Sequence, residues 1–222
     1  MTLIMFDMDG TLIDTDGVIA EHMAAAFSGA GLPAPSPADV RQIIGLSLPV
    51  AIGRLAGTED SILIGRLVED YKGHYRAMLE LQPGREPLFP GAREALERLR
   101  PGNLLGIATG KGLAGVRRIL AQHGLSEHFV TLQTPDHNPS KPHPGMLLRA
   151  MAETGAVAHE VVMIGDTVFD IELAKAAGVT SIAVGWGYHP REDLLAAGAD
   201  ALIESFDELD AAIADVLELV DA

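Results

Sequence analysis

The 222-residue sequence contains no cysteine. This absence excludes disulfide bonds, a thiolate metal site and a cysteine nucleophile. Basic residues are also scarce, because 16 Lys and Arg stand against 31 Asp and Glu and leave a formal net charge of -15. Non-specific binding to nucleic acid or to an anionic membrane requires a basic face, so we expect neither partner. A small anionic ligand remains compatible with the composition, since it needs only local positive charge.

The sequence has no apolar run that approaches the length of a membrane-spanning helix. No basic segment precedes its first apolar run, which argues against a secretory signal peptide. We therefore expect a cytoplasmic protein. A G-x-S-x-G motif is also missing, so a serine hydrolase of that type is not expected. Hydrophobic residues make up 48% and charged residues 21% of the chain, as in an ordinary globular protein.

Short apolar runs alternate with helical patterns through most of the chain. This alternation is typical of βαβ units and a parallel sheet, and strands that are apolar along their whole length indicate a sheet covered on both faces. We predict an α/β fold with a Rossmann-like parallel sheet sandwiched by helices. The expected strands are 2–6, 103–109, 161–166, 179–185 and 200–205, and the expected helices of this part are 92–100, 113–124, 144–155, 168–178 and 191–198.

One long segment breaks the alternation, because residues 16–82 show helical spacing and no strand pattern. We predict an all-helical cap domain at residues 16–83, inserted into an α/β core domain formed by 1–15 and 84–222. The connecting segments, 12–17 and 82–91, contain glycines that can absorb backbone rotation. They are expected to act as a hinge that opens and closes the cap.

Polar side chains follow three of the predicted strands. Asp7 ends the first apolar run, Thr109 the second and Asp166 the third. Ligands of open parallel sheets bind beyond the carboxyl ends of the strands, so we expect these side chains to meet, with Lys141 reaching the same edge from a loop. Each residue alone would be an ordinary turn, cap or solvated residue. Asp170 alone would complement a helix dipole. Their combination indicates a site.

This set of residues resembles the haloacid dehalogenase superfamily. The family's DxDGT motif is similar to the run DMDGT that begins at Asp7, and its strand-ending Ser or Thr is matched by Thr109. Its Lys before a helix is matched by Lys141, and its GDxxxD motif by the run that contains Asp166 and Asp170. The motifs occur in the family's order, and the helical insert lies where the family carries a cap. The runs SKPHPGML and IGDTVFDIELAKAAG look like the phosphoglycolate phosphatase branch.

The resemblance implies an Mg²⁺-dependent phosphatase that works through an aspartyl-phosphate. Asp7 would be the nucleophile and Asp9 the general acid and base. The implied metal ligands are the side chains of Asp7 and Asp166 and the backbone carbonyl of Asp9, with Asp170 holding metal-bound waters. Lys141 would restrain Asp7 or pair with Asp166. Because halide leaves without a proton, an acid at Asp9 also favours phosphoryl transfer over dehalogenation.

The resemblance further implies that Thr109, Lys141 and nearby backbone N–H groups bind the phosphoryl oxygens. Gly110 belongs to this substrate-binding set through its N–H, but it departs from the Asn or Ser that many members carry there. The lost side-chain contact is one that Lys111 can replace. We expect the departure to bear on the substrate and not on the reaction.

The residues that select the substrate are harder to find. Segment 40–55 lies where the family carries its specificity loop, and its polar candidates are Arg41, Gln42, Ser47 and Arg54. Arg41 can bind a substrate carboxylate bidentately, although Arg41 and Arg54 can equally be solvated helix residues. With the branch resemblance, this makes 2-phosphoglycolate the expected substrate among small phosphorylated metabolites.

Two alternatives to a phosphatase remain open. A phosphomutase similar to β-phosphoglucomutase would share the first steps, and a phospho-accepting receiver domain would use similar residues. Asp9 and the helical insert argue against the receiver. Trp186 and His189, which follow the fourth strand, can line the rim of the site or belong to a turn. Both a monomer and a homodimer are compatible with the sequence.

Overall fold

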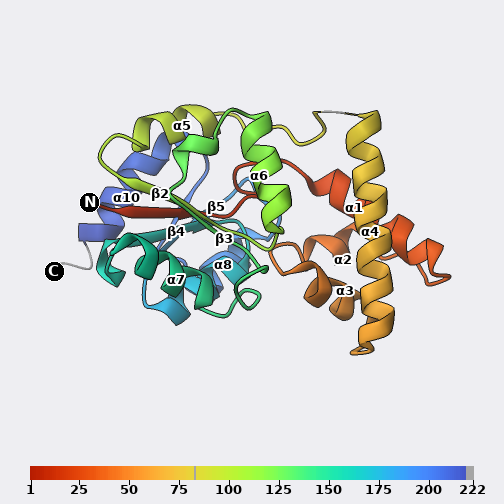
Figure 1. The fold of residues 1–222 in the computed structure, drawn as a ribbon. Helices are drawn as coiled ribbons and strands as arrows, with labels where there is room; N and C mark the ends of the chain where they lie inside the picture. The colour runs from red at the N-terminus through yellow and green to blue at the C-terminus, as the bar shows by residue number, and fades with distance from the viewer. Residues whose placement is uncertain (83, 219–222) are drawn as a thin grey trace.

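The computed structural model describes residues 1–82 and 84–218. Within them, six strands form one sheet with the order β3-β2-β1-β4-β5-β6, and all neighbouring strands are parallel (Figure 1). The predicted α/β fold with a parallel sheet is confirmed. The strands are β1 (Leu3–Phe6), β2 (Leu104–Ala108), β3 (Thr131–Gln133), β4 (Val161–Gly165), β5 (Thr180–Val184) and β6 (Ala201–Ile203).

Helices cover both faces of the sheet because alternate residues of each strand point to opposite sides. In β1, Ile4 and Phe6 belong to one buried cluster, whereas Leu3 and Met5 belong to another. The first face is covered by α5 (Ala92–Leu99), α6 (Leu113–Gln122) and α10 (Leu209–Glu218), and the second by α7 (Gly145–Thr154), α8 (Val168–Ala177) and α9 (Arg191–Ala197). This double cover explains why the strands are apolar throughout.

The strand order reverses next to β1, which pairs with β2 on one side and with β4 on the other. The chain leaves β2 toward β3 and leaves β4 toward β5, in opposite directions across the sheet. Such a switch point opens a crevice at the carboxyl ends of the strands, where ligands of this fold class bind. The residues after β1, β2 and β4 therefore surround that crevice.

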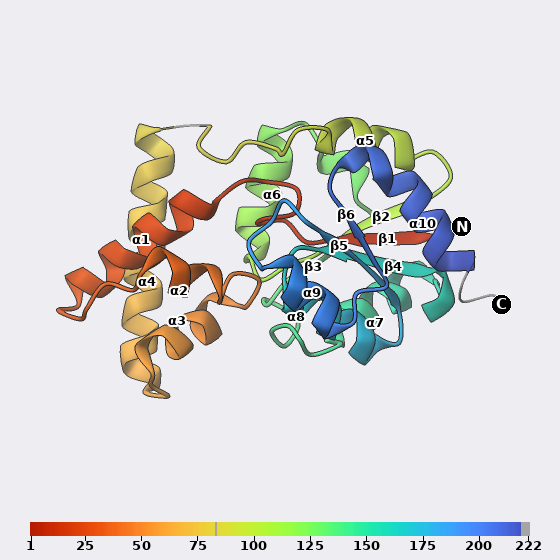
Figure 2. The same cartoon turned by 180° about the vertical axis from the view of Figure 1, so that it is seen from behind.

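The predicted helical insert consists of α1 (Asp16–Gly29), α2 (Pro37–Arg41), α3 (Leu48–Ala56) and α4 (Ser61–Leu81). These helices lie beyond the carboxyl ends of the strands, at the end of the molecule away from both termini (Figures 1 and 2). They have a buried apolar cluster of their own, which includes Met23, Ile52 and Leu67. The domain boundaries stay a prediction, and Pro83 and residues 219–222 of the predicted ranges lie outside the described residues.

The two segments that connect the insert to the core pair with each other. The Asp14 N–H donates to the Pro87 carbonyl, and the Phe89 N–H donates to the Leu12 carbonyl, both at 2.9 Å. Beside them, the fully buried Glu86 accepts hydrogen bonds from Tyr75 of α4 and from Arg118 of α6. The two segments predicted to form the hinge are therefore joined to each other by backbone hydrogen bonds. The motion of the hinge stays a prediction.

One strand and one α-helix were not predicted from the sequence. Strand β3 has three residues at the edge of the sheet, which is too short for a recognisable pattern. Helix α10 had a usable signal, because its buried residues Leu209, Ile213 and Val216 recur at helical spacing. None of the helices in the described ranges is both long enough and apolar enough to cross a membrane.

Candidate active site

The chain turns sharply as it leaves β1. The N–H groups of Thr11, Leu12 and Ile13 all point to the Met8 carbonyl, at 2.9–3.2 Å. Gly10 has φ +90°, and a Cβ atom there would lie 2.1 Å from Asp166 Oδ2. Only glycine fits this backbone conformation and this close approach. The turn therefore carries the first motif directly over the carboxylate that follows β4.

Asp7 is fully buried at the end of β1. Its Oδ1 lies 3.1 Å from Lys141 Nζ, and apart from this ion pair its carboxylate oxygens have no close partner of good hydrogen-bond geometry within the described structure. Burial raises the pKa of Asp7 to about 7, and Asp170 adds to the rise while Lys141 opposes it. A buried carboxylate with so few partners is costly unless a ligand completes its surroundings.

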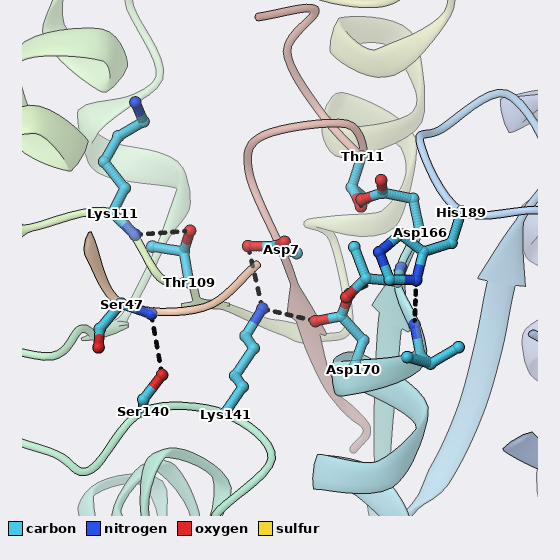
Figure 3. Close-up of polar contacts among 12 residues, drawn as sticks. Asp7, Thr11, Ser47, Thr109, Lys111, Ser140, Lys141, Asp166, Asp170 and His189 are labelled. Atoms are coloured by element: carbon cyan, nitrogen blue, oxygen red, sulfur yellow. Dashed lines mark hydrogen bonds and ion pairs between the residues drawn. The ribbon is translucent and has the colours of Figure 1, made fainter. Parts of the chain in front are cut away.

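Lys141 lies in the loop before α7 and is 1% exposed. Its Nζ bridges Asp7 Oδ1 at 3.1 Å and Asp170 Oδ1 at 2.5 Å (Figure 3). The alternative that Lys141 pairs with Asp166 is wrong. Asp170 occupies that place because its other oxygen is anchored at the start of α8, where it accepts the Thr167 hydroxyl and N–H at 2.7 and 3.1 Å.

Asp166 follows β4 and is held by two donors. Its Oδ1 accepts the Thr11 hydroxyl at 2.8 Å, and its Oδ2 accepts the Tyr188 N–H at 3.0 Å. Burial raises the pKa of Asp166 well above its usual range, and the neighbouring Asp7 and Asp170 raise it further. The structure thus crowds carboxylates that would repel each other without a cation between them.

The crowded carboxylates fit a divalent metal ion. Asp7, Asp166 and Asp170 each offer an oxygen, and these three oxygens lie within 4.8 Å of one another. With Asp9 there are four carboxylates at this edge of the sheet, against the ammonium groups of Lys111 and Lys141. When all are ionised, two negative charges are left over. A hard divalent cation that prefers oxygen ligands, such as Mg²⁺, balances them.

Asp9 is fixed by partners that the sequence analysis did not identify. Its Oδ1 accepts the Thr15 hydroxyl at 2.7 Å and lies 3.2 Å from Lys111 Nζ. The Thr15 N–H in turn donates to the Tyr188 hydroxyl at 2.8 Å. No sequence signal connects Tyr188 to the first motif, because only the fold brings the two segments together. Both contacts fall on Oδ1, which leaves Oδ2 available to a substrate.

The loop after β2 places Thr109 and Gly110 beside Asp7. Thr109 is 1% exposed, and its hydroxyl accepts the Lys111 N–H at 3.3 Å. A Cβ atom on Gly110 would lie 2.3 Å from the Leu46 carbonyl oxygen and 2.6 Å from that of Gly45. The insert therefore approaches the core so closely that an Asn or Ser would not fit here. This contact gives a physical reason for the departure from the family pattern.

A cavity of about 750 Å³ lies between the insert and the core. Its core side contains Asp7, Asp9, Thr109, Gly110 and Lys111, so the predicted catalytic and phosphate-binding residues of the first two motifs share one wall. The insert contributes mainly apolar and aromatic side chains, which include Ile19, Met23, Ile43, Leu48, Val68, Tyr71 and Tyr75.

Arg41 is not brought to this cavity. Its guanidinium pairs with Asp16, with Nε 2.9 Å from Oδ1 and Nη2 2.5 Å from Oδ2. It lines a separate recess of about 250 Å³ together with Trp186. The Trp186 indole N–H donates to the Thr11 carbonyl at 3.1 Å, and its ring packs 4.6 Å from that of Phe206. Arg41 and Trp186 are therefore placed apart from the predicted nucleophile.

The remaining candidates have mixed positions. Ser47 lines the cavity, and its N–H donates to the Ser140 hydroxyl at 2.8 Å. Arg54 lies over the ring of Phe169, 5.3 Å from the ring centroid. Gln42 is exposed and is not among the lining residues, and His189 Nδ1 accepts the Val168 N–H at 3.2 Å. Of the predicted polar residues of segment 40–55, Ser47 alone meets the cavity.

Comparisons with known proteins give consistent results. The family model described as haloacid dehalogenase-like hydrolase matches residues 4–184. A protein named probable phosphatase IndB from Dickeya dadantii is 35% identical over 222 residues, with 98% of this chain and 95% of the relative covered. A phosphoglycolate phosphatase from Vibrio parahaemolyticus is 34% identical over 214 residues, with 93% of each chain covered. A solved structure, a hydrolase from Pseudomonas syringae, has a TM-score of 0.85 at 25% identity and covers 97% of this chain and 99% of its own.

These matches extend over most of the chain and over nearly the whole length of the relatives. They confirm the resemblance that the four motifs indicated and set aside a receiver domain. The expectation of a phosphoric monoester hydrolase is confirmed as well. The chain belongs to the haloacid dehalogenase-like hydrolase family, and it is a phosphatase of the phosphoglycolate phosphatase-like branch.

Proposed function

We propose that the protein is an Mg²⁺-dependent phosphatase that hydrolyses a small phosphomonoester through an aspartyl-phosphate on Asp7. The observation that carries the proposal is the Asp7 carboxylate itself. It is buried, its Oδ1 lies 3.1 Å from the Lys141 ammonium, and it lines the cavity. A carboxylate in this state is prepared to act as a nucleophile once the charge of the incoming phosphate is neutralised.

The first chemical step joins an Asp7 oxygen to phosphorus and breaks the bond between phosphorus and the ester oxygen. Asp9 donates a proton to that leaving oxygen. In the second step Asp9 takes a proton from a water molecule, which attacks phosphorus and releases inorganic phosphate and free Asp7. Lys141 and the Thr109 hydroxyl hold phosphoryl oxygens during both steps.

The metal would be held by the side chains of Asp7 and Asp166 and by the Asp9 carbonyl, with Asp170 bonded to its waters. When bound, Mg²⁺ supplies positive charge that offsets the charge of the phosphoryl group. Thr15 and Lys111 keep the Asp9 carboxylate turned toward the cavity. The insert excludes bulk water while Asp7 attacks, and the paired connecting segments serve as its hinge.

The substrate that we propose is 2-phosphoglycolate. Support comes from relatives such as the one from Vibrio parahaemolyticus, which is named phosphoglycolate phosphatase. A cytoplasmic location and a monomeric or homodimeric state stay predictions. The phosphomutase alternative shares the first step and differs in its product, because it would yield an isomeric phosphate ester and no inorganic phosphate.

The proposal is tested by measuring inorganic phosphate released from 2-phosphoglycolate with Mg²⁺ and after removal of metal by chelation. Acid-quenched protein is then digested and searched for a phosphoryl group on the peptide that contains Asp7. We expect release only with Mg²⁺ and an acid-trapped phosphopeptide in the wild-type protein. Undiminished release after chelation, or the same turnover by Asp7→Asn, would overturn the mechanism.

A further inference from the structure

Lys111 lies on the wall of the cavity beside the acid–base carboxylate. Its side chain is 13% exposed, and its Nζ lies 3.2 Å from Asp9 Oδ1. Figure 3 shows the side chain extending away from the pair formed by Asp7 and Lys141. The two lysines therefore serve different parts of the cavity. Lys141 lies with the nucleophile, and Lys111 lies where the leaving group is expected.

The ammonium group of Lys111 has donor capacity to spare. Such a group carries three N–H donors. Asp9 can accept a hydrogen bond from one of them. The face of the Tyr75 ring, whose centroid is 5.2 Å from Nζ, attracts the positive charge through its π electrons. Among the described residues, no further acceptor lies in ion-pair or hydrogen-bond contact with Nζ. A largely buried cation that lines a cavity in this state is suited to an anionic ligand group.

Other cations that line the cavity are engaged away from Asp9. Lys72 forms an ion pair at 3.0 Å within its own helix, α4. Arg118 donates to the buried Glu86 at 2.8 Å, and Arg76 donates to the Lys72 carbonyl at 3.1 Å. Lys111 contacts Asp9 directly, and Asp9 is the residue expected to touch the ester oxygen. A negative charge near that oxygen would therefore meet Lys111 before it meets any of the other three cations.

The distances define how near that charge must be. A hydrogen bond from Asp9 Oδ2 to the ester oxygen spans about 2.8 Å, and the two oxygens of a carboxylate lie about 2.2 Å apart, so Lys111 Nζ lies at most roughly 8 Å from that oxygen and closer where this path bends. A carboxylate attached directly to the ester carbon covers about half of this span, and one charge-assisted hydrogen bond covers the rest. A hydroxyl at the same place would gain much less from the ammonium.

Building on the proposed function, we infer that Lys111 binds a carboxylate carried on the ester carbon of the substrate. The substrate class is then the phosphate monoesters of 2-hydroxy acids, of which 2-phosphoglycolate is the smallest. A cavity of about 750 Å³ also admits larger members. Lys111 thereby takes the role that the sequence analysis gave to Arg41.

The test compares two substrates of nearly equal size, 2-phosphoglycolate and 2-hydroxyethyl phosphate, which carries a hydroxymethyl group in place of the carboxylate. The kcat/KM ratio of the two is measured for the wild-type protein, Lys111→Met and Lys111→Arg. We expect the wild type to prefer 2-phosphoglycolate and Lys111→Met to lower the ratio by about 30–100-fold, the usual effect of removing a hydrogen bond to a charged group. Lys111→Arg should restore part of it.

A ratio has the advantage that a loss of folded protein cancels, since both substrates are measured on one preparation. Lys72→Met is the matched control, because Lys72 lines the same cavity but is paired within α4, and its ratio should stay at the wild-type value. If Lys111 only positions Asp9, both substrates will slow equally in Lys111→Met and the inference is wrong.

The outcome also separates this inference from the proposed function. A wild-type protein that cleaves both compounds equally well in Mg²⁺ is a phosphatase without the carboxylate site, so the inference alone fails. A wild-type protein that releases phosphate from neither compound overturns the proposed substrate class and this inference together.

Discussion

The strand edge of the core and the helical insert meet at one cavity but are built in different ways. On the core side, charged groups are almost fully buried and hold one another, as Lys141 does with Asp7 and Asp170. On the insert side, the cavity wall is mainly apolar. The Ser47 N–H of the insert donates a hydrogen bond to the Ser140 hydroxyl of the core. Buried charged side chains that hold one another at the switch point are suited to one reaction. The apolar wall belongs to a separate helical unit, so its side chains can differ for different substrates without altering the charged groups.

The largest effect should come from the core carboxylates. We expect Asp7→Asn to lower turnover by about 10⁴-fold or more, because no other group near phosphorus can form the covalent intermediate. Asp9→Asn should behave differently with an aryl phosphate, whose leaving group needs no proton. It should accumulate phosphoprotein, since the second step still needs the base. Acid-quenched mass spectrometry measures both.

Two results would contradict these roles of Asp7 and Asp9. Phosphoprotein that accumulates in Asp7→Asn would move the nucleophile to another residue. Equal loss of phosphoprotein in both variants would mean that Asp9 is already needed to form the covalent intermediate with an aryl phosphate. Circular dichroism of each variant provides the control for folding.

The contact between the two regions should matter next. Gly110→Ala places a methyl group against the carbonyls of Gly45 and Leu46, so the insert must move outward. We expect kcat/KM to fall about 10–100-fold, because closure excludes water and completes the site. Gly112→Ala is the matched control, because its added methyl group would meet its nearest neighbour at 3.5 Å, an ordinary contact.

The readout for this pair should include the position of the insert. Small-angle scattering, or proteolysis of the connecting segments, should show a more open molecule for Gly110→Ala and an unchanged one for Gly112→Ala. Similar activity in the two variants would show that the close approach at Gly110 does not govern closure.

The burial of Asp7 predicts how stability depends on pH when metal is absent. Its pKa is raised from 3.8 to about 7 in the folded protein, so the folded state favours the protonated carboxyl. The sign follows from linkage: stability from this group is present at low pH and is lost as pH rises through about 7. Metal-free protein should gain roughly 10–15 °C in Tm at pH 8 from Asp7→Asn.

Two further measurements sharpen this prediction. At pH 5 the variant and the wild type should differ far less, because Asp7 is then protonated in the fold. Added Mg²⁺ should raise the wild-type Tm more at pH 8 than at pH 5, since the metal binds the ionised carboxylate. A difference between variant and wild type that does not change with pH would contradict the raised pKa.

The smallest effect should come from Arg41 on the insert. Its guanidinium is paired with Asp16 and lines the smaller recess. We therefore expect Arg41→Met to leave the kcat/KM ratio of 2-phosphoglycolate to 2-hydroxyethyl phosphate within about twofold of the wild type, as for exposed pairs generally. A large fall in this ratio would mean that Arg41, and not Lys111, binds the substrate carboxylate.

Most of the core could be predicted because its signals are local. Apolar runs such as that of β1 predict buried parallel strands, and polar residues directly after them must lie at the carboxyl edge. Asp7, Thr109 and Asp166 therefore surround one crevice, where the structure has them. Strand β3 was not predicted because an edge strand of three residues is too short to show a hydrophobic pattern.

The sequence by itself determined most of the elements, the ends of the longer strands and which polar residues follow them, because these depend on neighbours along the chain. Tertiary structure alone decided the partners of the side chains. Lys141 contacts Asp170, Tyr188 supports Thr15, and Arg41 faces Asp16 outside the cavity. Such pairs join residues that are distant in the sequence, and packing selects them because each buried charge needs a partner within a few ångströms.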